Sequence, residues 1–105
     1  MIIAVDYDGT LENSGQINLQ LIAALRTAQR RGDTVILWTC REGKRLGEAL
    51  ATLRTAGFRP NLVNANAPEA IRALGHDPRK IYADVYIDDK GATPWKSAKS
   101  SGPDT

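Results

Sequence analysis

The fold of this chain is decided by the stretch IIAVDYDGT at residues 2–10. Its first four residues are apolar and mostly β-branched, which is typical of a buried strand. The Asp-x-Asp-Gly that follows contains residues that favour turns. We therefore expect a strand over residues 2–5 that runs into a sharp turn, with Asp6 and Asp8 at its carboxyl end.

Helical and strand patterns alternate from there on. Apolar residues recur at helical spacing at Leu19, Ile22, Leu25 and Ala28. Gly32 supplies the stop that ends such a helix. The pattern then predicts a strand over residues 34–38 and a second helix that closes at Gly57.

The second half of the chain continues this alternation. Residues 62–63 predict a short third strand, and the next helix has Asn66 and Glu69 at the spacing of a capping box, with Gly75 at its end. Apolar and polar residues then alternate over residues 82–87, which is the two-residue period of a fourth strand.

Strands that alternate with helices predict an α/β fold. We expect a Rossmann-like three-layer sandwich around a short parallel sheet of about four strands. A length of 105 residues suits one domain, which we assign to residues 1–96. Residues 97–105 are rich in Ser, Gly and Pro without periodicity and predict a disordered tail.

Composition excludes several classes of protein. Hydrophobic residues at 42% and charged residues at 25% are ordinary for a globular protein in water. No apolar run approaches the roughly 18 residues of a membrane span, so we expect a cytoplasmic protein with no membrane partner. A net charge of +2 is too small to indicate nucleic-acid binding by itself. The single cysteine, Cys40, cannot form an internal disulfide and is predicted to be a small buried hydrophobe.

Polar residues follow each of the four predicted strands. They are Asp6 and Asp8 after the first, Thr39 after the second, Asn64 after the third, and Asp88 and Asp89 after the fourth. Ligands of parallel sheets bind beyond the carboxyl ends of the strands. We therefore expect these side chains to converge on one edge of the sheet.

The chemistry of this set predicts a magnesium site. Carboxylates at one edge repel each other, by about 4 kcal/mol for a pair at 4 Å and an effective dielectric near 20. Oxygen ligands without histidine or thiol suit Mg²⁺, so we expect Asp6, Asp8, Asp88 and Asp89 to hold this cofactor. A phosphate substrate would then also need a cation such as Lys80 and a neutral donor such as Thr39.

Three runs of the sequence resemble the motifs of the haloacid dehalogenase-like phosphatases. Residues 3–10, IAVDYDGT, are similar to the first motif, DxDGT. Residues 35–39, VILWT, resemble the second motif, and residues 86–89, YIDD, the acidic fourth motif. Lys80 is chosen as the lysine of the third motif, with Arg79 and Lys90 as alternatives. The resemblance covers residues 2–90.

The resemblance implies a magnesium-dependent phosphomonoester hydrolase. In it Asp6 would be the nucleophile that becomes an aspartyl phosphate, and Asp8 the general acid and base. Thr39 and Lys80 would hold and neutralise the phosphoryl group. Asp88 would bind magnesium together with the Asp6 carboxylate and the Asp8 carbonyl, and Asp89 would assist. The remaining candidate substrate-binding residues are Gly9, Thr10, Arg41 and Asn64.

Members of this family often carry a cap domain, but the two places for it are short here. We therefore expect an open site. Such a site suits a phosphorylated substrate that closes the pocket itself, or a second subunit acting as lid in a homodimer. The sequence leaves open whether the substrate is a sugar phosphate, a nucleotide or a nucleic-acid end.

Other functions remain to be weighed. A phospho-accepting signalling module resembling bacterial receivers also groups Asp, Thr and Lys around magnesium, but with its acidic residues in another order along the chain. A non-catalytic magnesium-binding scaffold of the same fold is a further alternative. A cysteine phosphatase is excluded because Leu46, not arginine, stands six residues after Cys40. A Walker loop ending at Lys44 is excluded by Trp38 and Arg45.

Overall fold

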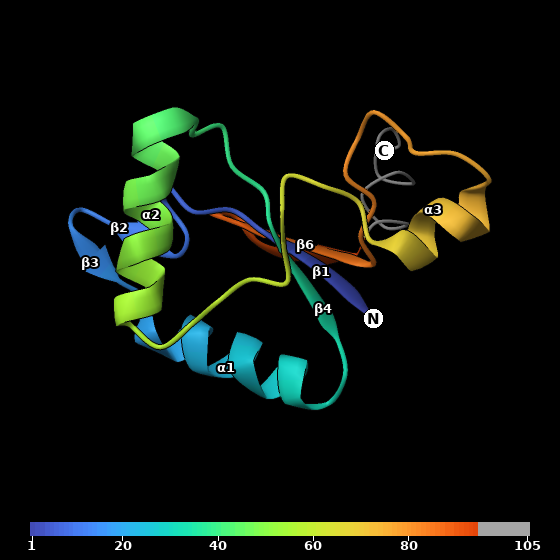
Figure 1. The fold of residues 1–105 in the computed structure, drawn as a ribbon. Helices are drawn as coiled ribbons and strands as arrows, with labels where there is room; N and C mark the ends of the chain where they lie inside the picture. Colours follow the sequence, from blue (N-terminus) through green and yellow to red (C-terminus); the bar gives the residue numbers. More distant parts are fainter. Residues whose placement is uncertain (95–105) are drawn as a thin grey trace.

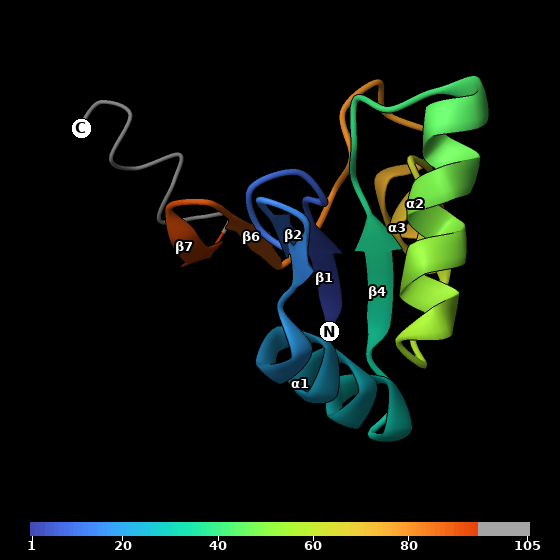
Figure 2. The same cartoon turned by 90° about the vertical axis from the view of Figure 1, so that its left-hand side faces the viewer.

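The computed structural model describes residues 1–94, which contain a five-stranded sheet in the order β5-β4-β1-β6-β7. Four of its strands run parallel: β1 (Ile2–Val5), β4 (Thr34–Leu37), β5 (Leu62–Val63) and β6 (Val85–Asp88). β7 (Gly91–Pro94) pairs antiparallel with β6, and Figure 2 shows β4, β1, β6 and β7 side by side. The predicted parallel sheet of about four strands is confirmed, while the antiparallel edge strand β7 was not predicted.

Helices cover both faces of the sheet. α1 (Leu19–Arg30) and α2 (Gly43–Thr55) lie on one face and α3 (Pro68–Leu74) on the other (Figure 1). This is the expected three-layer α/β sandwich. Strand order moves outward from β1 to β5 and then returns to β6 on the other side of β1, so the chain reverses its direction of growth beside β1. In such sheets the ligand site lies at this reversal.

The two faces of β1 point into two hydrophobic cores, because successive side chains of a strand alternate between faces. Ile3 and Val5 pack with α1 and α2. Ile2 and Ala4 pack with the alanines of α3 and its neighbours. This two-sided burial makes the strand apolar throughout, as its sequence indicates.

The ends of α1 and α2 follow the predicted signals. Asn18 caps α1 by accepting a hydrogen bond from Leu21 N at 3.1 Å. Gly32 and Gly57, beyond the two helices, have φ of +97° and +86°, which glycine adopts without strain. Leu19 departs from the predicted apolar face: it is 65% exposed, because the first residue of α1 faces away from the sheet.

The predicted capping box at Asn66 and Glu69 is wrong. Pro68 is the first residue of α3, and the N-cap is Ala67, in the extended conformation that a residue before proline favours. Asn66 is 8% exposed and accepts a hydrogen bond from Tyr82 N at 2.6 Å. Its amide nitrogen donates to three oxygens of the loop that follows α3: Asp77 Oδ1, Pro78 O and Lys80 O.

β6 begins at Val85, three residues later than the alternating pattern predicts. The backbone N–H groups of Tyr82 and Ala83 donate to side chains, the Asn66 amide and the Tyr86 hydroxyl, instead of to a neighbouring strand. Regular pairing with β1 starts only beyond this loop.

Between β1 and α1 the chain forms a small hairpin that was not predicted. Its strands are β2 (Glu12–Asn13) and β3 (Gln16–Ile17), joined through Ser14 and Gly15 at positive φ. The described part of the chain, residues 1–94, contains no inserted domain after β1 or β4. The predicted tail over residues 97–105 lies outside the described residues. None of the helices in residues 1–94 is long and apolar enough to cross a membrane.

Candidate active site

Asp6 lies at the centre of the carboxyl edge of the sheet. It directly follows β1, between β4 and β6, and its N–H donates to Ile87 O at 3.0 Å. On the other side Trp38 N donates to Val5 O at 2.8 Å. Hydrogen bonding between strands thus continues up to Asp6. Thr39 lies two residues beyond β4, and Asp88 is the last residue of β6, with Asp89 next to it, so all three lie at the same edge of the sheet.

A hollow of about 180 Å³ opens at this edge. Asp6, Trp38, Thr39 and Cys40 line it. It brings together the predicted nucleophile and the predicted phosphate-binding hydroxyl, which are far apart in the sequence. The prediction that Cys40 is buried is wrong, since its side chain is exposed. β4 ends at Leu37, one residue before the end of the predicted strand, and the chain leaves the sheet before Cys40.

Asp6 is surrounded by negative charge. Burial raises the pKa of Asp6 above its ordinary value. A hydrogen bond from Tyr7 N to Asp6 Oδ1, at 2.7 Å, opposes this rise in pKa. The charges of Asp8, Asp88 and Asp89 raise the pKa further. Burial is thus the largest cause of the raised pKa of Asp6, and the charges of the three other Asp residues add to it.

Asp8 is paired with Arg41. Arg41 Nε and Nη2 donate to the two Asp8 carboxylate oxygens at 3.0 and 2.9 Å, a bidentate pair. The Arg41 guanidinium also lies 4.8 Å from the centre of the Tyr7 ring. Its hydrogen bonds hold the pKa of Asp8 below the ordinary value. Arg41, a predicted substrate-binding residue, thus contacts the predicted acid and base, a pairing that no sequence signal indicates.

Gly9 and Thr10 form the turn beside the acidic pair. Gly9 has φ of +81°, and a Cβ there would lie 3.6 Å from Asp89 Cβ, so the first motif packs against the fourth. The Gly9 N–H donates to Glu12 O at 2.8 Å, within the turn. Thr10 is 6% exposed, and among residues 1–94 its hydroxyl has no hydrogen-bond partner.

Asn64 is bound to the backbone of Thr39. Its Oδ1 accepts from Thr39 N at 2.8 Å, and its Nδ2 donates to Thr39 O at 2.9 Å. Thr39 Oγ1 in turn accepts from Arg41 N at 3.1 Å. Both polar ends of the Asn64 amide are therefore engaged, and this predicted substrate-binding residue positions Thr39.

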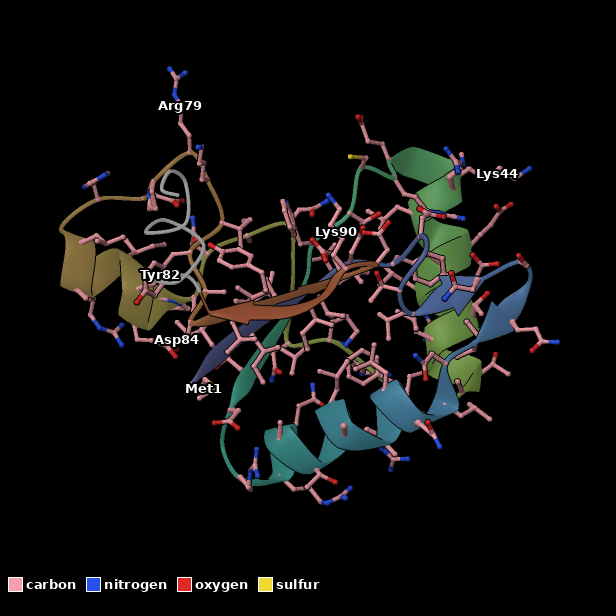
Figure 3. All side chains as sticks on the ribbon, turned by 180° about the vertical axis from the view of Figure 1, so that it is seen from behind. Met1, Lys44, Arg79, Tyr82, Asp84 and Lys90 are labelled. Carbon is pink, nitrogen blue, oxygen red and sulfur yellow. The ribbon has the colours of Figure 1, made fainter. Side chains whose placement is uncertain are left out.

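The three candidate cations occupy two places. Lys80 and Arg79 line a second hollow of about 510 Å³ together with Trp38, Ile81 and Tyr86. Trp38 lines both hollows, so the hollow that contains Lys80 adjoins the hollow that contains Asp6. Lys90 instead lies beyond the carboxyl end of β6, whereas Arg79 extends from its loop away from the sheet (Figure 3). Lys90 N donates to Asp88 Oδ1 at 2.8 Å, so the backbone of Lys90 lies beside the Asp88 side chain.

The acidic residues do not form a ready-made metal cage. Within residues 1–94, no three Asp, Glu, His or Cys side chains are grouped so that they could hold an ion. Asp8 in particular is turned to Arg41. Mg²⁺ is commonly held by one or two carboxylates plus water and substrate phosphate, so it does not require such a group. Asp88 and Asp89 do act on Asp6 through their charges, which help to raise its pKa.

Two known proteins are similar to this chain, while no protein-family model matches it. Phosphatase YwpJ of Bacillus subtilis (strain 168) is 36% identical over 93 residues, which are 87% of this chain. The match spans only 30% of the length of that phosphatase. A conserved protein of Bacteroides thetaiotaomicron with a solved structure is 31% identical, with a TM-score of 0.72. That match covers 99% of this chain and 90% of the other, so both share nearly their whole fold.

Proposed function

We propose that this chain, which belongs to the same family as the Bacteroides thetaiotaomicron protein, is a magnesium-dependent phosphatase of the haloacid dehalogenase-like superfamily. The observation that carries the proposal is the hollow in which Asp6 and Thr39 meet at the carboxyl edge of β1 and β4. The similarity to phosphatase YwpJ supports the same class of reaction.

In the proposed reaction the Asp6 carboxylate attacks the phosphorus of a phosphomonoester. A bond forms between Asp6 and phosphorus, and the bond from phosphorus to the leaving oxygen breaks. Asp8 gives its proton to the leaving oxygen and later takes one from the water that hydrolyses the aspartyl phosphate. Thr39, which Asn64 holds in place, binds a phosphoryl oxygen through its hydroxyl.

The oxygen donors around Asp6 fit a magnesium ion. The carboxylates of Asp6, Asp88 and Asp89 and the main-chain carbonyl of Asp8 are the groups that would hold it. Their mutual repulsion, which helps raise the pKa of Asp6, is the kind that a cation relieves. When bound, magnesium supplies the positive charge that lets a phosphate dianion approach these carboxylates.

Arg41 is the proposed link between substrate binding and Asp8. Guanidinium groups bind phosphate as well as carboxylate in bidentate fashion. A phosphate group near Thr39 therefore competes with Asp8 for Arg41. Because Asp8 is half-exposed, water screens its ion pair with Arg41, and the pair can open at small cost.

The proposal is tested by measuring phosphate release from p-nitrophenyl phosphate, sugar phosphates, nucleotides and phosphorylated oligonucleotides, with magnesium or with EDTA. We expect release that requires magnesium and that is abolished in Asp6→Asn. Asp84→Asn is the matched control. Asp84 lies beside Met1 at the opposite edge of the sheet (Figure 3), and its carboxylate accepts from Ile2 N, which an amide oxygen can replace.

Two results would contradict the proposal. Release that persists in Asp6→Asn would exclude Asp6 as nucleophile. A folded wild-type protein that releases no phosphate from any substrate would exclude the hydrolase. In that case a stable phosphoenzyme formed with acetyl phosphate would indicate a phospho-accepting module, and magnesium binding without phosphorylation a scaffold.

A further inference from the structure

The hollow of about 510 Å³ that Trp38, Arg79, Lys80, Ile81 and Tyr86 line adjoins the Asp6 hollow, with which it shares Trp38. We propose that it binds the leaving group of the substrate, and that this leaving group contains a nucleobase and a second phosphate. The inference rests on the proposed function, because it takes the scissile phosphate to lie at Asp6. We call this second hollow the base subsite.

Trp38 provides the surface for an aromatic ring. It directly follows β4 and is 42% exposed, unusually open for a tryptophan beside a sheet core. Tyr86 supports it edge-to-face, with ring centres 5.7 Å apart and an interplanar angle of 69°. The Trp38 indole is thus exposed, held by a neighbouring ring and next to the proposed phosphoryl site. Such a ring suits base stacking, because every nucleobase has a π face.

The loop that carries Lys80 and Ile81, which line the base subsite, is held in place by hydrogen bonds. The Tyr86 hydroxyl donates to Ile81 O and accepts from Ala83 N at 3.2 Å. The buried Asn66 amide binds the same loop at Lys80 O and Tyr82 N. A wall formed before the ligand arrives loses little freedom on binding, which favours affinity.

The charge at the base subsite favours an anion. Among residues 1–94, the side chains of Arg79 and Lys80 take part in no hydrogen bond or salt bridge. None of the five residues that line the subsite is acidic. Two adjacent cations that have no partner among residues 1–94 lie beside a stacking surface, and together they fit a phosphate on the same nucleoside. A simple sugar phosphate has no aromatic ring and no second phosphate, so it would leave both features unused.

Two sources supply this chemistry, a nucleoside bisphosphate and the phosphorylated end of an oligonucleotide. The volume of the base subsite lies in the range of about 300–1,000 Å³ that is usual for small-ligand sites. One base with its sugar and second phosphate can therefore be accommodated from either source. Both sources are included as separate arms of the test.

The test compares kcat/KM for four substrates: ribose 5-phosphate, adenosine 5′-monophosphate, adenosine 3′,5′-bisphosphate and a 5′-phosphorylated oligonucleotide. Trp38→Ala should lower kcat/KM for the three base-containing substrates about 5- to 100-fold, the effect of losing one base–aromatic stack. The loss for ribose 5-phosphate should be clearly smaller, and it is not expected to be zero, because Trp38 also lines the Asp6 hollow. Trp38→Phe, which keeps a ring, should retain most of the activity on nucleotides.

Arg79→Gln tests the second phosphate. It should lower kcat/KM for the bisphosphate and the oligonucleotide but not for the monophosphate. Arg72→Gln, an exposed arginine on α3 that does not line the base subsite, is the matched control and should change none of the four values. The larger of the two wild-type values, bisphosphate or oligonucleotide, identifies the source.

A binding measurement separates this inference from the proposed function. Calorimetry with adenosine 3′,5′-bisphosphate is done on the Asp6→Asn protein, where turnover does not interfere, with and without Trp38→Ala. Loss of binding in Trp38→Ala supports the base subsite even if the wild type hydrolyses nothing. Equal loss of kcat/KM on ribose 5-phosphate and nucleotides, or a wild-type preference for ribose 5-phosphate, overturns the subsite while leaving the phosphatase in place. Thermal unfolding checks that each variant is folded.

Discussion

Asp6 and Asp8 are two residues apart but have opposite electrostatic surroundings. The pKa of Asp6 is raised by burial and by neighbouring carboxylates, and the pKa of Asp8 is lowered by Arg41. The proposed roles need the reverse, an ionised nucleophile and an acid that can carry a proton. A cation beside Asp6 and a substrate phosphate that engages Arg41 would each move the respective pKa in the required direction.

The pairing of Asp8 with Arg41 can be measured directly. In Arg41→Gln we expect the pKa of Asp8 to rise toward its ordinary value of 3.8, because the hydrogen bonds that lower it are lost. The measurement is an NMR titration of the Asp8 carboxyl carbon. Arg45→Gln is the control: Arg45 acts on Asp8 only through its charge and is the smallest of the causes, so the rise should be smaller. An unchanged pKa in Arg41→Gln would mean that the pair does not form in solution.

The charge of Asp6 should destabilise the metal-free protein. Its folded-state pKa lies above the unfolded value near 3.8, so the folded state binds more protons and stability falls as pH rises between the two values. Above both, the loss of stability persists. Without magnesium at pH 7, Asp6→Asn should therefore have a higher Tm than the wild type.

With magnesium, the wild type should have a higher Tm than Asp6→Asn, because magnesium binding stabilises the wild type. At a concentration 100 times its Kd, a ligand adds about 2.7 kcal/mol. Asp6→Asn should gain less, whereas the control Asp84→Asn should gain as much as the wild type. Thermal unfolding with magnesium or EDTA measures both effects. A wild-type Tm that magnesium leaves unchanged would contradict magnesium binding at Asp6.

At the level of elements, asparagine side chains complete a short edge of the sheet. β5 has only two residues, and side-chain amides extend its contacts with β4. Asn61 Oδ1 accepts from Val35 N at 2.8 Å, and Asn64 binds the Thr39 backbone. Asn66 then fixes the loop before β6. The stretch from Asn61 to Asn66 therefore holds Thr39 of the candidate active site through Asn64, and the loop that lines the base subsite through Asn66.

Asn66→Ala should destabilise the protein by about 1–3 kcal/mol, since it leaves buried donors and acceptors without partners. Urea unfolding measures this change, and hydrogen exchange should show faster opening of the loop over residues 75–84. Asn13→Ala, at an exposed position in the β2–β3 hairpin, should change the unfolding free energy by less than about 0.5 kcal/mol. Equal stability of the two variants would show that the Asn66 hydrogen bonds contribute nothing.

For the whole molecule, the core under α1 and α2 has the larger side chains. Leu37, Leu53 and Phe58 are fully buried there, whereas the face under α3 is built largely from alanines. Small residues let α3 lie close to the sheet but bury little apolar surface. Most of the hydrophobic stabilisation therefore comes from the core under α1 and α2.

Leu37→Ala should accordingly reduce the unfolding free energy by about 2–5 kcal/mol, the usual cost of a core leucine. That is a large share of the total of about 5–15 kcal/mol for a typical domain. Leu19→Ala, the same change at an exposed residue, should have an effect below about 1 kcal/mol. Denaturant unfolding compares the two, and similar midpoints would contradict this assignment of the core.

The assembly and the limits of the domain stay predictions. A homodimer in which a second subunit covers the site is one of these predictions, and sedimentation analysis would measure it. The predicted domain boundary at residue 96 lies just beyond the described residues 1–94.

The sequence by itself determined the four parallel strands, the sandwich and the edge of the sheet at which Asp6 and Thr39 line one hollow. Strand periodicity is local, and each of these polar residues lies at or within two residues of the end of its strand, so their convergence follows from the topology. Only the tertiary structure decided that Arg41 pairs with Asp8, that Asn64 holds Thr39 and that Asn66 binds a loop instead of capping α3. These are contacts of single side chains between distant segments, and no local period encodes them.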